Sequence, residues 1–225
     1  PGSHGNDRNI QQRLLGEVEV PGDIATGSPV RYNPGGIAGV YATENSREAL
    51  FSAMQRRETF GTSGPRIEPR FFAGWDLDED LCRDPQYLAA AYRDGVPMGS
   101  LLPASAEPGA GPVFVASATR DARVGANLLQ RIQVIMGWVD AKGRTHQAVH
   151  TIAGAAGDNA RVDPDSCAVS GTGYNQLCTS WRDPDFDPGQ AAVYYVRVLE
   201  NPSCRWSRFD CLSLPEAERP DSCND

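Results

Sequence analysis

The sequence has no long apolar run and no excess of basic residues. No run approaches the ~20 apolar residues that a membrane-spanning helix needs, so we expect no membrane segment. Lysine and arginine number 21 against 29 aspartates and glutamates, which gives a net charge of -8. Nucleic-acid binding depends on basic side chains that meet phosphates. The composition therefore predicts neither a membrane protein nor a nucleic-acid-binding protein.

The chain also lacks the familiar motifs of catalytic sites. It contains no G-x-S-x-G turn and no Gly-Lys-Ser/Thr phosphate loop, and its three histidines lie far from any obvious nucleophile. The first residues, Pro1-Gly2-Ser3-His4-Gly5, are polar and do not resemble a signal peptide. We expect a processed, cleaved or truncated start and no turnover by this chain alone.

No Cys-x-x-Cys pair is present, which argues against a zinc cluster. Six cysteines, an even number, indicate disulfides and an oxidising compartment such as the periplasm or the cell exterior, with free buried thiols as the alternative. Six cysteines allow about 15 pairings. Cys167–Cys178 and Cys204–Cys211 would each close a short polar loop and are favoured, which leaves Cys82–Cys223.

A loop-rich segment precedes one clear helix, predicted over residues 45–59. Asn45 is a suitable N-cap, and Glu48 three residues later completes a capping-box pattern. Ala49, Leu50 and Met54 belong to an apolar stripe that also includes Ala53. This stripe must be buried, because a lone helix gains too little from propensity alone.

After Pro65 the apolar pattern changes to a period of two, which is typical of strands. Asp140 to Gly143 form a hairpin loop, and Pro69 is expected to interrupt the first strand. The fold class predicted is α+β, mostly an antiparallel β-sandwich. The predicted strands are "RIEPRFFAGWDL", "PVFVASATRD", "RIQVIMGWVD", "RTHQAVHTIAG" and "AAVYYVRVLEN".

Two groups of residues look like metal ligands but are interpreted structurally. His146 and His150 would share one face of a helix, but along a strand four residues span about 13 Å, too far for one metal. Asp183, Asp185 and Asp187 match the first three calcium ligands of an EF-hand, whereas the rest of that loop is missing. We expect Asx turns in a stiff corner, with a differently built calcium site as the alternative.

The polar stretch "FGTSGPR" is the candidate ligand-binding segment. Thr62, Ser63 and Arg66 could reach a ligand oxygen or phosphate, although turn formation alone also explains them.

Several segments together resemble the family DUF3604, which is similar to the PHP metal-dependent hydrolases. These segments are "NPGGIAGVYATENSREALFSAMQRRETFGTSGPRI", "FFAGWDL", "GVPMG", "RIQVIMGWVD" and "DPDFDPGQAAVYYVRVLENPSCRW". The resemblance implies a longer parent with a metal-binding α/β barrel, whose His, Asp and Glu ligands lie mostly upstream. A late Asp-x-His motif of the family precedes a Pro-Gly that looks like Pro1-Gly2, so His4 is not expected to be a ligand.

The resemblance also implies a division of the chain. Residues 1–66 would be the remnant of the barrel with its last helix, residues 67–206 the β-sandwich, and residues 207–225 a disulfide-tied tail. The parent would use zinc, manganese or iron to hydrolyse a small ester, and this chain would hold no metal. Its partner would be the upstream barrel. The alternative is a self-contained, noncatalytic module that binds a ligand or partner.

Overall fold

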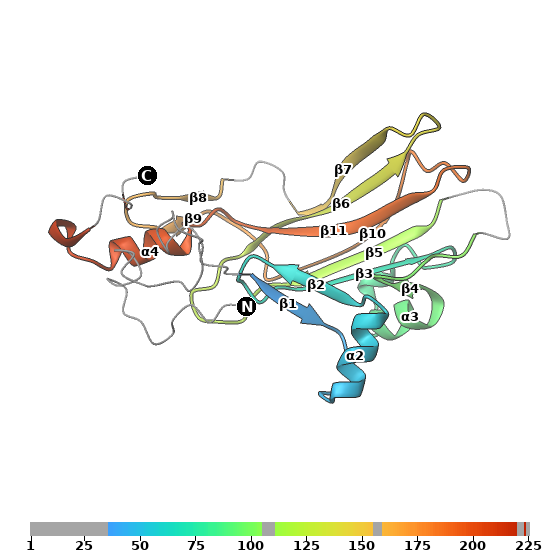
Figure 1. The fold of residues 1–225 in the computed structure, drawn as a ribbon, viewed down its shortest axis with the longest axis horizontal. Helices are drawn as coiled ribbons and strands as arrows, with labels where there is room; N and C mark the ends of the chain where they lie inside the picture. Colours follow the sequence, from blue (N-terminus) through green and yellow to red (C-terminus); the bar gives the residue numbers. More distant parts are fainter. Residues whose placement is uncertain (1–35, 105–110, 155–158, 220–222, 224–225) are drawn as a thin grey trace, which may run out of the picture.

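The structure, a computed structural model, describes residues 36–104, 111–154, 159–219 and 223 (Figure 1). The predictions on Pro1–Gly5 and His4 lie outside these residues. The helices are α2 (Arg47–Gln55), α3 (Tyr87–Asp94) and α4 (Trp206–Leu212), with short 3-10 turns η2 (Leu81–Arg83) and η3 (Glu216–Glu218). The strands are β1 (Ile37–Val40), β2 (Thr59–Thr62), β3 (Glu68–Gly74), β4 (Val96–Pro97), β5 (Val113–Thr119), β6 (Leu129–Val139), β7 (Thr145–Gly154), β8 (Arg161–Val162), β9 (Val169–Ser170), β10 (Gln176–Arg182) and β11 (Ala192–Glu200).

Two larger antiparallel sheets form the body of the molecule. One has the strand order β10-β5-β3-β4 and the other β11-β6-β7. Two small sheets, β1-β2 and β8-β9, lie beside them, with α2 next to the first and α4 near the second (Figure 1). The predicted β-rich α+β fold is confirmed.

The main core lies between the two larger sheets. Phe71 and Phe114 from the four-stranded sheet pack with Ile132 and Val134 of β6, all less than a tenth exposed. Phe72 and Val115, their sequence neighbours, point to the opposite face and pack under α3 and η2 in a second cluster. The run "VFVA" of β5 is therefore apolar throughout because both faces of this inner strand are covered.

Pro69 lies inside β3 rather than interrupting it, so that expectation was wrong. It stands opposite Ala118 of β5. On its other side, β4 pairs only with Phe72 and Ala73, and no other strand of the described residues pairs with β3 there. A proline is tolerated at such a position because no ladder partner requires its missing N–H.

Helix α2 is shorter than predicted, and its N-cap lies one residue later. Ser46, not Asn45, is the N-cap, since its side chain accepts a hydrogen bond from the backbone N–H of Ala49 at 3.2 Å. The helix ends at Gln55 because Arg57 adopts a left-handed conformation (φ 59°) and Thr59 already pairs with Val40 in the β1-β2 sheet. Competition with strand pairing thus removed the last predicted turn.

The apolar stripe of α2 is only partly covered by the residues that the structure describes. Ala53 is fully buried, but Met54 remains 54% exposed and the neighbouring Phe51 56% exposed. Leu50 is half-buried. The barrel origin of residues 1–66 and the boundaries at residues 66 and 206 stay predictions.

All six cysteines form disulfides, which confirms the predicted cross-linking, but the predicted pairing was wrong. The bonds are Cys82–Cys178, Cys167–Cys204 and Cys211–Cys223. Cys178 belongs to β10, opposite Ser117 of β5, whereas Cys167 lies between the small strands β8 and β9. Strand pairing separates these two neighbours, so closeness in sequence did not predict contact.

No helix among the described residues is long and apolar enough to cross a membrane.

Candidate functional site

A cavity of about 860 Å³ opens between the two larger sheets. Its walls come from three parts of the chain: the facing sides of the sheets, the segment 98–104 after β4, and the segment 186–191 before β11. The sheets contribute Phe71, Phe114, Met136 and Tyr194. The cavity is thus a space at one end of the main core that the side chains of the strands do not fill.

Aromatic contacts shape the floor of the cavity. The rings of Phe71 and Phe114 stack with centroids 5.6 Å apart, and the ring of Tyr194 lies 4.5 Å from that of Phe114. These side chains meet because alternate residues of β3, β5 and β11 face the same core.

The wall formed by residues 98–104 is held to the sheet by hydrogen bonds. The indole N–H of Trp75 donates to the carbonyl of Pro103 at 2.8 Å, and the backbone N–H of Met98 donates to the carbonyl of Phe71 at 2.8 Å. Trp75 also meets the edge of Phe186, with ring centroids 5.9 Å apart. The polar lining side chains are those of Ser100, Asp187, Gln190 and Tyr194. An apolar cavity with a few polar groups is the usual form of a small-molecule site.

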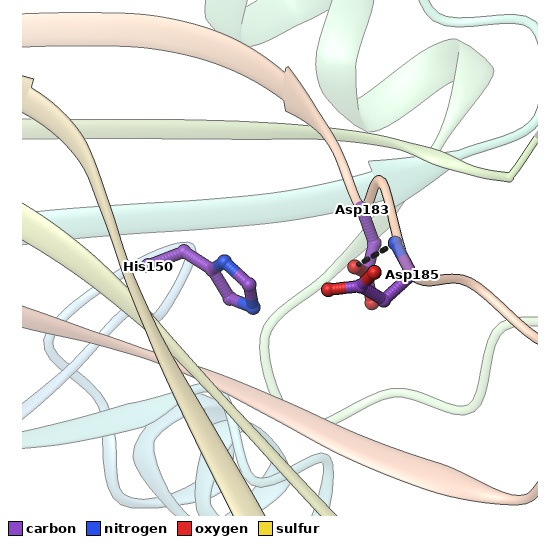
Figure 2. A group of neighbouring side chains, drawn as sticks. All are labelled: His150, Asp183 and Asp185. Carbon is purple, nitrogen blue, oxygen red and sulfur yellow. Dashed lines mark hydrogen bonds between the residues drawn. The ribbon is translucent and has the colours of Figure 1, made fainter.

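A second site lies where β7 approaches the turn after β10. Figure 2 shows the imidazole of His150 on β7 facing the carboxylates of Asp183 and Asp185. One ligand atom from each residue lies within 4.8 Å of the other two. Asp183 is 5% exposed, His150 is half-buried, and Asp185 is exposed.

The aspartates after β10 form the Asx turns that the sequence predicted. Asp183 accepts the backbone N–H of Asp185 at 2.9 Å, and Asp187 accepts that of Gly189 at 2.8 Å. The other oxygen of Asp183 accepts the hydroxyl of Tyr194 at 2.6 Å. Burial, together with this hydrogen bond to a carboxylate, raises the pKa of Tyr194 well above its usual range, so the phenol stays protonated and donates.

The two histidines of β7 have different surroundings. His146 contacts a carboxylate oxygen of Asp140 through Nε2 at 3.0 Å and stacks on Trp138. The ring of His150 lies 5.0 Å from that of Trp181, and its Nε2 is buried with no hydrogen-bond partner among the described residues. Both histidines lie in a strand, as predicted.

Sequence reasoning considered His150 and the aspartates separately and missed their proximity. Their meeting depends on β7 and β10, the edge strands of different sheets, lying beside each other. The period-two pattern shows which face a residue occupies but not which strand lies across from it.

The predicted ligand residues Thr62, Ser63 and Arg66 lie apart from both sites. Thr62 ends β2 and accepts the backbone N–H of Gly64 at 3.1 Å, while Ser63 is exposed. The backbone N–H of Arg66 donates to the buried carboxylate of Asp121 at 2.8 Å. None of the three lines the described cavity, and their ligand-binding role stays a prediction.

The fold class, a β-rich α+β protein with an apolar cavity between its sheets, is thus established from the structure. Comparison with protein families shows that residues 3–224 match the family described as "Protein of unknown function (DUF3604)", so the chain belongs to that family. No curated protein and no solved structure matches the chain.

Proposed function

We propose that this chain is the C-terminal portion of a PHP-like metal-dependent hydrolase of the periplasm or the cell exterior. In this proposal the cavity takes up the apolar part of a small ester substrate, with a phosphoester as the first choice. The observation that carries the proposal is the cavity, whose volume of about 860 Å³ suits a small molecule. The three disulfides fit an oxidising compartment.

The chemistry would be divided between two parts of the parent protein. Zinc, manganese or iron ions in the upstream barrel would activate a water molecule for attack on the ester. This chain would close the barrel and shape the substrate side, as its resemblance to the family implies. The exposed side chains of Phe51 and Met54 on α2 offer an apolar surface for contact with the barrel.

The cavity is tested by filling its entrance. Ala192 is exposed and lines the cavity, so Ala192→Trp narrows the entrance without disturbing the core. We expect the isolated chain to bind 1-anilinonaphthalene-8-sulfonate, an apolar aromatic anion, and Ala192→Trp to weaken this binding. Ala141→Trp, in the exposed hairpin turn, is the matched control. Equal binding by all three proteins would exclude the cavity as the ligand site.

The hydrolase part is tested with 4-nitrophenyl phosphate. We expect no turnover by the 225-residue chain. A longer protein that includes the upstream portion should hydrolyse the ester in a chelator-sensitive manner, with a higher KM after Ala192→Trp. Turnover by the isolated chain that survives repurification and is abolished by a chelator would contradict the proposed division.

A second candidate function is a self-contained, noncatalytic binding module. The observation that favours it is that the cavity and the core beneath it both come from residues 67–198 of this chain. Ligand binding by the isolated chain, combined with no turnover by the longer protein, would favour this function over the first.

A further inference from the structure

The tripeptide Asp-Pro-Asp occurs twice in the chain and forms the same turn both times. Asp163 accepts the backbone N–H of Asp165 at 2.8 Å, just as Asp183 accepts that of Asp185 at 2.9 Å. At the first turn the guanidinium of Arg208 lies 3.6 Å from Asp165. At the second turn the neighbouring side chain is an imidazole, that of His150. Because the two turns have the same local sequence, the position of His150 beside the second turn must come from the tertiary structure.

The buried nitrogen of His150 is the second observation. A buried polar atom usually has a hydrogen-bond partner, so an exception calls for a specific explanation. Nε2 of His150 is buried without such a partner among the described residues, and it belongs to a side chain that faces two carboxylates (Figure 2). A cation bound between the three groups would satisfy both the imidazole nitrogen and the carboxylate charge.

We propose that His150, Asp183 and Asp185 bind one divalent transition-metal ion, with Zn²⁺ as the reference metal. Imidazole and carboxylate ligands suit zinc, manganese and iron, whereas calcium and magnesium prefer oxygen ligands alone. Three protein ligands leave further coordination positions for water or a ligand. From the sequence, the alternative for these aspartates was a calcium site with Asp187 and without His150, and the family resemblance implied metal ligands upstream of the chain.

The geometry requires only a small adjustment of the side chains. Two ligands at about 2.1 Å from a zinc ion are at most about 4.2 Å apart, compared with the present limit of 4.8 Å. Asp185 is exposed, and rotation of its side chain can close this difference. Asp183 and the ring of His150 are already held, by the hydroxyl of Tyr194 and by Trp181 respectively.

Tyr194 is assigned as a positioning residue for the ion. Its hydroxyl fixes one carboxylate oxygen of Asp183, and hydrogen bonds of this kind to a metal ligand affect affinity by about 10–100-fold. Its ring also lines the cavity, so the ion lies beside the space where a ligand would bind. The metal proposal does not depend on the proposed function, because it concerns binding of the ion alone.

The test is a titration of the untagged, chelator-treated 225-residue chain with Zn²⁺ by calorimetry. We expect one strong site per chain. Asp185→Asn, at an exposed position, and His150→Gln should each weaken it by about tenfold or more, and Tyr194→Phe by about tenfold. The matched controls, Asp165→Asn in the other Asp-Pro-Asp turn and His146→Gln on the same strand, should bind as the unmodified chain does.

A spectroscopic measurement identifies the ligand directly. In an NMR titration with Zn²⁺, the imidazole resonances of His150 should shift while those of His146 stay in place. The absence of a strong site in the unmodified chain would overturn the proposal. So would a site whose affinity is unchanged by both His150→Gln and Asp185→Asn, since the ion would then be bound elsewhere.

Discussion

At the residue scale, Asp121 shows how a buried charge holds two segments together. Its carboxylate is almost fully buried and accepts the backbone N–H groups of Arg66 and Arg123 at 2.8 and 2.9 Å, as well as the guanidinium of Arg123. The bonds from the Arg123 side chain and then from the Arg66 backbone hold the pKa of Asp121 well below its ordinary value. The carboxylate of Asp121 thus joins the segment that follows β2 to the segment that follows β5.

We predict that Asp121→Asn destabilises the chain by about 2 kcal/mol at neutral pH, because bonds from charged and backbone donors are lost. The folded-state pKa is lowered, so the stabilisation exists above the unfolded-state pKa of about 3.9 and declines as the pH falls below it. Urea unfolding of both proteins at neutral and acidic pH measures the loss of stability and its pH dependence. Asp94→Asn, at a surface pair with Arg93, is the control. A loss independent of pH would contradict the prediction.

Gly154 occupies a position where a side chain has no room. It ends β7 beside the irregularity in the β6-β7 pairing, with φ +80°, and an added Cβ would lie 2.2 Å from the backbone carbonyl oxygen of Gln130. Gly143 in the hairpin turn has a similar φ of +76° but open space around it.

We predict that Gly154→Ala lowers the free energy of unfolding by more than about 3 kcal/mol, because strain of the left-handed conformation adds to a backbone clash. Gly143→Ala should cost only about 1 kcal/mol, since it has the conformational strain alone. Chemical denaturation of both variants gives the comparison. Equal losses would mean that the backbone around Gly154 shifts freely.

At the element scale, the disulfide Cys82–Cys178 joins η2 to β10 across the edge of the four-stranded sheet. It closes a sequence separation of 96 residues, whereas Cys211–Cys223 closes only 12. Longer loops restrict the unfolded chain more, although strain and residual structure modify the effect.

We predict a loss of about 4 kcal/mol for Cys82→Ala combined with Cys178→Ala, and a smaller loss for the Cys211→Ala and Cys223→Ala pair. Thermal or chemical unfolding compares the two double variants. Peptide mapping under nonreducing conditions should recover Cys82 linked to Cys178. Recovery of Cys167 linked to Cys178 would contradict the observed pairing.

At the scale of the whole molecule, α2 packs mainly beside the small β1-β2 sheet and not on the larger sheets. It has nine residues, of which only Ala53 is buried, and short helices are marginal without packing. Its sheet, β1-β2, is tied to β3 by the hydroxyl of Tyr41, which donates to Pro69 at 2.8 Å, and by Arg70 stacked over the Tyr41 ring.

We predict that residues 45–60 exchange their amide hydrogens quickly in the isolated chain and slowly in a longer protein that contains the upstream portion. The expected reason is that the exposed Phe51 and Met54 become covered. Hydrogen exchange with mass spectrometry measures this, with the buried strand β5 as a slowly exchanging internal control. Slow exchange of residues 45–60 in the monomeric, isolated chain would favour the self-contained module.

The sequence by itself determined the local structure. The alternation of apolar residues predicted β6 and β11 because a strand exposes alternate side chains to one core, and the hairpin loop at Asp140 to Gly143 predicted β7 as the returning strand. The Asp-Pro pattern predicted the Asx turns at Asp183 and Asp187, which depend on neighbouring residues only. The even number of cysteines likewise indicated disulfides, and the quoted segments indicated the family.

Tertiary structure alone decided which of these elements meet. Contact between the edge strands β7 and β10 brings His150 to Asp183, and the placement of η2 beside β10 joins Cys82 to Cys178. The same packing leaves a cavity between the two larger sheets, and Phe114 and Tyr194 are among the residues that line it. Local patterns specify the face of a strand, but the choice of its neighbour depends on the burial of all apolar faces at once. For this reason neither the cysteine pairing nor the candidate metal site followed from the sequence.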